Sequence, residues 1–390
     1  MAQMSNSENL RKQADDLEEK VNSLDREDLP TANIVVAGIT GSGKSTLINA
    51  VFGSDLAKTG TGRPITQNIN DYNIPEIPIR IWDTVGFELD SEKTKRAIQD
   101  IRQTIADKAK SKNQFDRIHA IWYCIQEGAN RYQSSETDFV KSLYELGVPF
   151  IIVITKSITD DEYANTICEI NRTVGIGKIE VIPVLAQEYK TKLGAIPAFG
   201  LGKLVNMTLE KLPEFIRSGF VAAQKVDVAL KRIECEKIVV ECAKAAKEGF
   251  LDKVPLINLF TTDKKVKTMF GKICKIYNAT LSDIYLEQVT DNMTVTWKKN
   301  MGWLANPFVN KYKNKLEELL KKMSGDGDWN VEKQEFTDWE RSALMITYYG
   351  YLFVLSIEEV WSEATEEQLK DMDYILHKIT RKFNDKFYGK

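Results

Sequence analysis

One short segment, GITGSGKS at residues 38–45, constrains this chain more than any other feature of its sequence. It fits the pattern G-x-x-x-x-G-K-[ST] without a departure, and it lies between an apolar run at 33–37 and a helical stretch at 45–52. Glycines in that context let consecutive backbone N–H groups curl around a phosphate at the amino end of a helix. We therefore expect a nucleotide phosphate site, in which Lys44 reaches the β- and γ-phosphates and Ser45 ligates Mg²⁺. The residues of this segment expected to contact the nucleotide are Gly38, Thr40, Gly41, Ser42, Gly43, Lys44, Ser45 and Thr46.

Residues 29–217 alternate between strand and helix patterns. Several of the strand candidates are short apolar runs, as expected for strands that are buried on both faces. With helical stretches between most of them, the rhythm predicts an α/β domain with a doubly wound, mainly parallel sheet. A short link with two prolines joins 71–74 to 78–82 and predicts an antiparallel hairpin there. The strand candidates are 33–37, 71–74, 78–82, 117–125, 150–155 and 178–184.

The chain has 390 residues, which favours two or three domains. From about 218 to 390 the strand patterns fade, and the sequence predicts an all-α domain. Residues 1–28 form a separate amphipathic pattern, with apolar positions at spacings of three and four. That stripe could pair with a second copy of the chain or pack on its own domain. The helices expected after 218 are 220–249, 266–278, 281–298, 307–323, 338–356 and 365–387.

Composition limits the classes of partner. The hydrophobic fraction of 43% and the charged fraction of 28% are ordinary for a soluble globular protein. The net charge of −3 gives no global positive field, so nucleic acid is not an expected partner. Five scattered cysteines, none at C-x-x-C spacing, argue against a zinc site and favour reduced thiols in a cytoplasmic protein. The longest apolar runs, such as Phe150–Ile154, are too short to span a bilayer. Peripheral contact with a membrane stays open.

Two further elements complete the predicted phosphate site. Asp83 and Gly86, in the sequence DTVG, directly follow the apolar strand that ends at Trp82. A carboxylate there can hold Mg²⁺ through water, and the N–H of Gly86 can sense the γ-phosphate. A threonine between the two motifs can coordinate Mg²⁺ from a flexible loop that relaxes after hydrolysis. Thr66 is the first choice for that role and Thr61 the reserve.

Together these motifs resemble those of the translation-factor-related GTPases, which include septins, immunity-related GTPases and Era-like bacterial proteins. The resemblance covers about residues 31–215, through GITGSGKSTLINAVFG at 38–53, GRPITQ at 62–67 and DTVG at 83–86. It is closest to bacterial proteins that carry a helical domain after the G domain. It implies a G domain at 29–217 that binds GTP or GDP with Mg²⁺, and a helical domain at 218–390.

The guanine motif of that group is [N/T]-K-x-D, whose aspartate accepts hydrogen bonds from N1 and the 2-amino group of guanine. Thr155 and Lys156 match it, but Ile158 stands in the aspartate position and cannot accept those bonds. Asp160 and Asp161 follow closely and are the candidates to substitute for it through a longer loop. A second base contact is expected from the segment VLAQ at 184–187. The residues expected there are Ala186 and Gln187.

The residue after DTVG bears on hydrolysis. Ras-like enzymes carry a glutamine there to orient the attacking water, whereas this chain carries Phe87. Glu88 is the nearest polar candidate, and a residue from a second subunit is the alternative. Gly41 stands where potassium-stimulated members carry asparagine, so potassium activation is not supported. The catalytic set expected from sequence is Lys44, Thr66, Gly86 and Glu88.

Three functional interpretations follow. The first is a slow GTPase that acts as a conformational switch, through a nucleotide-dependent homodimer or movement of its helical domain, and that engages a protein effector. The second is a nucleotide-binding structural or interaction protein with little hydrolysis, which Phe87 and Ile158 favour. The third is a dynamin-like membrane-associated GTPase. The segment 242–278 faintly resembles a helical domain that follows some bacterial G domains, in which it is more apolar and can touch membrane, but here lysines interrupt it.

Overall fold

The computed structural model describes residues 29–53, 63–66, 69–73, 77–84, 92–127, 134–158, 167–168, 172, 179–192, 194–249, 258–279, 307–325, 329–331, 336–365 and 367–388. The helices expected at 1–28 and 281–298 lie outside these residues. Contacts between Cα atoms group Leu29–Asp227 into one compact unit and Val228–Lys390 into another. The division at 227/228 falls later in the chain than the expected one at 217/218.

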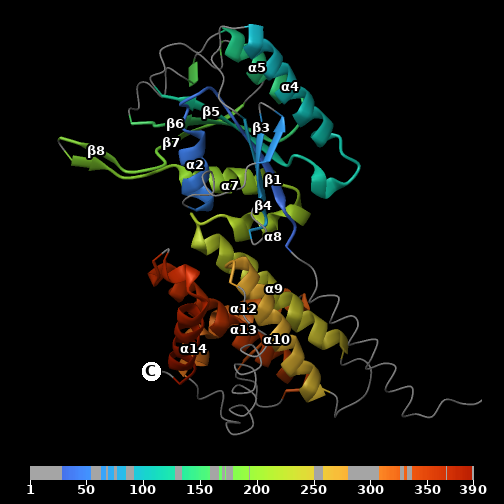
Figure 1. The fold of residues 1–390 in the computed structure, drawn as a ribbon. Coiled ribbons are helices and arrows are strands. Elements are labelled where there is room, and N and C mark those ends of the chain that lie inside the picture. The colour runs from blue at the N-terminus through green and yellow to red at the C-terminus, as the bar shows by residue number, and fades with distance from the viewer. Residues whose placement is uncertain are drawn as a thin grey trace, which may run out of the picture. The chain divides into compact units, whose positions relative to one another are not determined.

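A seven-stranded sheet forms the centre of the first unit (Figure 1). Its strand order is β2-β3-β4-β1-β5-β6-β7, and the five strands from β4 to β7 run parallel. The expected mainly parallel sheet is confirmed, as is the antiparallel hairpin, in which Asp71 pairs with Trp82. The strands are β1 Ala32–Ala37, β2 Arg63–Thr66, β3 Ile69–Asn73, β4 Ile79–Thr84, β5 Ala120–Gln126, β6 Phe150–Thr155 and β7 Glu180–Val184.

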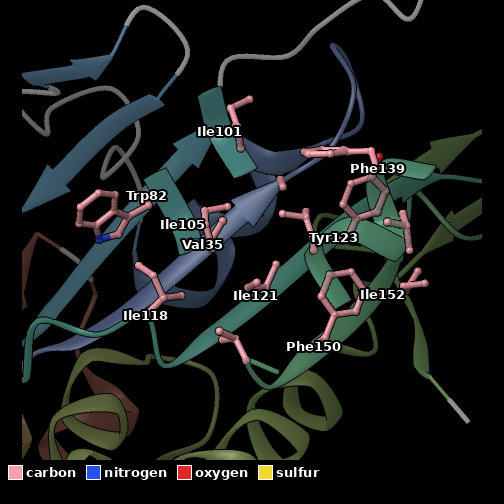
Figure 2. Close-up of a cluster of buried hydrophobic side chains, with 14 of the residues drawn as sticks. Val35, Trp82, Ile101, Ile105, Ile118, Ile121, Tyr123, Phe139, Phe150 and Ile152 are labelled. Carbon is pink, nitrogen blue, oxygen red and sulfur yellow. The ribbon is translucent and has the colours of Figure 1, made fainter. Parts of the chain in front are cut away.

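Alternate residues of the parallel strands point to opposite faces of the sheet, and each face is covered by helices. On one face, α4 (Glu92–Ala109) supplies Ile101 and Ile105, and α5 (Ser134–Tyr144) supplies Phe139 to a buried cluster (Figure 2). Such a doubly covered sheet explains why the central strands are apolar throughout their length.

On the other face lie α2 (Lys44–Phe52), α7 (Leu201–Lys211) and α8 (Glu214–Ala223). Trp122 of β5 links them to the sheet. Its ring stacks on Phe52 at 5.8 Å, and its Nε1 donates to Thr208 Oγ1 at 3.0 Å. The carboxyl end of the helix that follows the glycine-rich loop is therefore fixed against the sheet.

The helix expected at 220–249 is two helices, α8 and α9 (Val228–Gly249), separated by a turn. Gln224 is fully buried at that turn, where its Nε2 donates to Asp227 O and its Oε1 accepts from Asp227 N, both at 2.8 Å. The side chain thus replaces the helical hydrogen bonds that would have continued α8. Because Gly219 packs so closely on Pro30 that a Cβ would lie 1.7 Å from its carbonyl oxygen, α8 belongs to the first unit.

The regular elements among the described residues of the second unit are all helices. The long helix α13 packs against the other four, and stacked rings of Phe270 and Phe353, 4.1 Å apart, lie in its core. Within α13, Trp339–Glu363 is long and apolar enough to cross a membrane by length and composition, and 83% of its most apolar window is buried. A buried core helix of a soluble protein has the same length and composition. A helix was expected at 338–356, but its apolar character was not. The other four helices are α9, α10 (Asn258–Ile276), α12 (Pro307–Ser324) and α14 (Met372–Tyr388), with α13 at Asp338–Glu363.

Candidate functional site

The glycine-rich loop joins β1 to α2 and bends where its glycines are. Gly41 and Gly43 have φ values of +80° and +83°, which L-residues with side chains rarely adopt. A Cβ on Gly38 would lie 2.4 Å from the carbonyl oxygen of Cys124 on β5, so only glycine fits there. Gly43 caps α2 without a side-chain hydrogen bond to the first turn of the helix. The first N–H groups of α2 are thus left to an anion, as the sequence predicts.

Lys44 lies inside this loop, with only 8% of its surface exposed. Its Nζ donates to the backbone carbonyls of Gly38 at 2.9 Å and Ile39 at 3.1 Å. Burial lowers the pKa of the ammonium group below its usual value, and the nearby charge of Asp83 opposes that change. The ammonium group of Lys44 is therefore held next to the place where the loop would bind a phosphate.

Asp83 lies near the carboxyl end of β4 and is 7% exposed. Burial raises the pKa of its carboxyl from 3.8 to about 6, and Lys44 opposes the rise. Its Oδ1 is buried and has no hydrogen-bond partner among the described residues. A buried carboxylate oxygen without a donor fits a cation ligand, directly or through water. Ser45, exposed in the first turn of α2, supplies the hydroxyl expected for the same ion.

The segment after β6 is tied to the phosphate loop. Thr155 Oγ1 donates to Ser42 O at 2.6 Å, and Lys156 Nζ donates to Gly41 O at 3.0 Å. Lys156 also donates to Gln126 Oε1 at 2.9 Å and adopts a left-handed backbone with φ of +55°. Thus both matching residues of the expected base motif contact the loop that would hold the phosphates.

Glu127, which the sequence motifs do not indicate, binds the same segment from the end of β5. The residue is 6% exposed, and its carboxylate accepts from Ser157 Oγ at 2.5 Å and from Ile158 N at 2.6 Å. The signal that could have found it is the one used for Asp83, an acidic residue directly after an apolar strand. The side chain of Ile158 itself is 40% exposed.

The second expected base contact lies beside the first. Ser157 N donates to Val184 O at 3.3 Å, which joins the segment after β6 to the end of β7. Ala186 follows as a partly buried residue and Gln187 as an exposed one. Leu185 pairs with Phe199 across an exposed hairpin of β8 (Tyr189–Thr191) and β9 (Gly194–Ile196).

Thr66 differs from its expected setting. The sequence places it in a flexible loop, but the structure places it in β2, where its backbone pairs with Ile69 of β3. Residues 63–66 form a strand despite their loop-like composition, because the unpaired backbone groups at the edge of β3 bind them. Several other expected site residues lie outside the described residues. These are Thr61, Gly86, Phe87, Glu88, Asp160 and Asp161.

Residues 33–156 match the family model of the 50S ribosome-binding GTPases. This match spans the phosphate loop, the strand that ends in Asp83 and the Thr155–Lys156 pair. The segment is therefore a P-loop GTPase domain, as its resemblance implies.

A curated relative, cell division control protein 10 of Saccharomyces cerevisiae, is 30% identical over 151 residues. The match covers 33% of this chain and 47% of the relative, so the chain spans about half the length of that protein. Among solved structures, a probable GTP-binding protein engB is 25% identical, with 48% of this chain and 99% of that chain covered and a TM-score of 0.33. A variant of Era from Aquifex aeolicus bound to GDP and AlF4⁻ is 21% identical, with 56% and 68% covered and a TM-score of 0.33.

Proposed function

We propose that this P-loop GTPase domain binds GTP and GDP with Mg²⁺, hydrolyses GTP slowly, and acts as a conformational switch. The observation that carries the proposal is the buried Lys44, whose Nζ is held by the carbonyls of Gly38 and Ile39 inside the loop. Triphosphate binding would draw that ammonium group onto the β- and γ-phosphates, where it offsets their negative charge.

The residues around Lys44 fit a magnesium ion. Ser45 and Asp83 would hold it, with Thr66 as the switch ligand, and the ion would supply positive charge beside the phosphates. The unpartnered Oδ1 of Asp83 supports this assignment. Within the part of the chain that the structure describes, Lys44 is the group whose charge favours the ionised form of Asp83 in the absence of the ion.

Hydrolysis needs a group that orients the attacking water, and Phe87 cannot do so. We infer that a second copy of the chain supplies this group or orders the switch segments, as an activating protein does in trans. Glu88 is the alternative within the chain. The predicted apolar stripe at 1–28 would offer surface for pairing. The apolar stripe of α14 would not, because Ile375, Ile379 and Phe383 are buried within the second unit. A protein effector would read the resulting state.

The test is turnover per site, measured as phosphate release across the micromolar range of protein concentration. Light scattering with a non-hydrolysable GTP analogue runs in parallel. Activity that rises with concentration, together with nucleotide-dependent dimers, supports the trans mechanism. A flat curve with a monomer throughout rejects it and transfers the search to Glu88 or an outside activator.

A second candidate function is nucleotide binding with little or no hydrolysis. Ile158 in place of the base-reading aspartate favours it, because a site with weakened base recognition suits a structural role. Tight binding without phosphate release at any concentration would select this function. Titration with GTP, GDP and ATP then tests whether the site takes guanine nucleotides at all.

A further inference from the structure

The residue that reads the purine edge in the [N/T]-K-x-D motif is replaced here, and the structure shows what stands in its place. Ile158 directly follows the Thr155–Ser157 segment that is bonded to the phosphate loop, so its position relative to a bound nucleotide is set. Its side chain carries no hydrogen-bonding group. Because that side chain is 40% exposed, water reaches the surface around it.

Glu127, the described carboxylate that contacts this segment, cannot take over the missing role. Glu127 uses one carboxylate oxygen for the Ser157 hydroxyl and the other for the N–H of Ile158, at 2.5 Å and 2.6 Å. It is also 6% exposed, so turning it towards a base would break both bonds and leave the Ile158 N–H without its acceptor. Glu127 therefore holds the segment in place and does not read the nucleotide.

Among the described residues, Lys156 offers an apolar surface to the face of a purine ring. The Nζ of Lys156 is anchored to Gly41 O and Gln126 Oε1, so its four-carbon stem spans the distance from β6 to the phosphate loop. An anchored aliphatic stem offers apolar contact to any flat purine ring. Such contact is the same for bases that differ only in one substituent on the edge.

Resting on the proposed function, we propose that this site does not distinguish purine nucleotides that differ only at C2, and that Ile158 is the residue that sets this tolerance. Guanine and hypoxanthine differ only by the 2-amino group. A site built to bond a polar group rejects the analogue that lacks it, whereas a site without the partner gains nothing from that group. Here water solvates the 2-amino group beside the exposed Ile158, so its presence neither helps nor hinders binding.

The experiment compares GDP and IDP, since neither diphosphate is a substrate for hydrolysis. Both are titrated into the full chain with Mg²⁺ by calorimetry, in the parent and in Ile158→Asp, with Ile158→Leu as the matched control. We expect the parent and Ile158→Leu to bind the two within about threefold. Ile158→Asp should prefer GDP by about tenfold or more, because a carboxylate bonded to N–H groups is worth about that factor.

Two results would overturn the proposal. One is a parent that prefers GDP by tenfold or more, which would assign the 2-amino contact to another group such as Asp160 or Asp161. The other is a folded Ile158→Asp variant, checked by its melting temperature, whose GDP to IDP ratio equals that of the parent. A parent that binds neither diphosphate nor GTP would instead reject the proposed function, and this inference with it.

Discussion

The hydroxyl of Thr155 donates a 2.6 Å hydrogen bond to the backbone carbonyl of Ser42, which lies 113 residues earlier in the sequence. Thr155 is 2% exposed, and its Cβ and Oγ1 also lie 3.3 Å from where a side chain on Gly43 would begin. One buried threonine thus fixes the phosphate loop against the segment expected to meet the base. The bond keeps the phosphate loop and the segment after β6 at a fixed distance from each other.

That bond can be removed by Thr155→Val, which keeps the shape of the side chain. We expect about a five- to tenfold loss of GDP and GTP affinity, because a buried hydrogen bond is worth about 1 kcal/mol and the Ser42 carbonyl is left without its donor. Thr155→Ser should retain parent affinity. Equal affinities for all three proteins in calorimetric titrations would mean that the bond does not organise the site.

Loss of the Lys44 ammonium should abolish tight triphosphate binding. We expect Lys44→Ala to weaken GTP binding by about 100-fold or more, since hydrogen bonds to charged groups are worth roughly 1.5–3 kcal/mol each and, in the proposed site, Lys44 would bind two phosphates. Lys203→Ala, which removes an exposed lysine of the same unit, is the matched control. A Lys44→Ala protein that binds GTP as the parent does would refute the assignment of the phosphate site.

Ser45 can be tested as a metal ligand by comparing two conditions. We expect Ser45→Ala to weaken GDP binding more with Mg²⁺ present than with EDTA, because only the contact between hydroxyl and metal is lost while the backbone cradle stays. The ratio of the two dissociation constants is the measurement. An equal loss in both conditions would show that Ser45 does not ligate the ion.

Asp83 should make the stability of the protein free of nucleotide and metal depend on pH. Its pKa rises from 3.8 to about 6 on folding, so the folded state holds this proton more tightly than the unfolded state. The contribution of the Asp83 carboxyl to the free energy of unfolding is therefore fully present below pH 3.8. It is lost as the pH rises through about 6. The full loss is about 3 kcal/mol, since a tenfold change in an acid constant is about 1.4 kcal/mol.

Asp83→Asn removes this carboxyl. In EDTA, we expect the variant to melt at a higher temperature than the parent above pH 6, with a difference that shrinks as the pH falls to 4. The same variant should lose Mg²⁺-dependent GTP affinity. Asp107→Asn, which removes an exposed acid on α4, controls for net charge. A melting difference that is constant with pH would contradict the burial of the Asp83 carboxyl.

The sequence by itself determined the phosphate loop, the sheet and most of its strands. The loop could be recognised because strand, glycines, lysine and helix follow one another within twenty or so residues, and local geometry alone makes them a phosphate cradle. The β3–β4 hairpin was equally local. Apolar runs identified the parallel strands because strands that are covered on both faces have no polar side.

The tertiary structure decided what depends on the pairing of distant segments. Gln126 lies opposite Thr155 because β5 and β6 pair in one register, and that register brings Glu127 to Ser157 and Ile158. No spacing in the sequence encodes this register. The end of the first unit at Asp227 depends likewise on the buried amide of Gln224, which a helical pattern read along the chain cannot reveal. Contacts between residues far apart in sequence are fixed only when burial and strand pairing are satisfied together, and the base side of this site is built from such contacts.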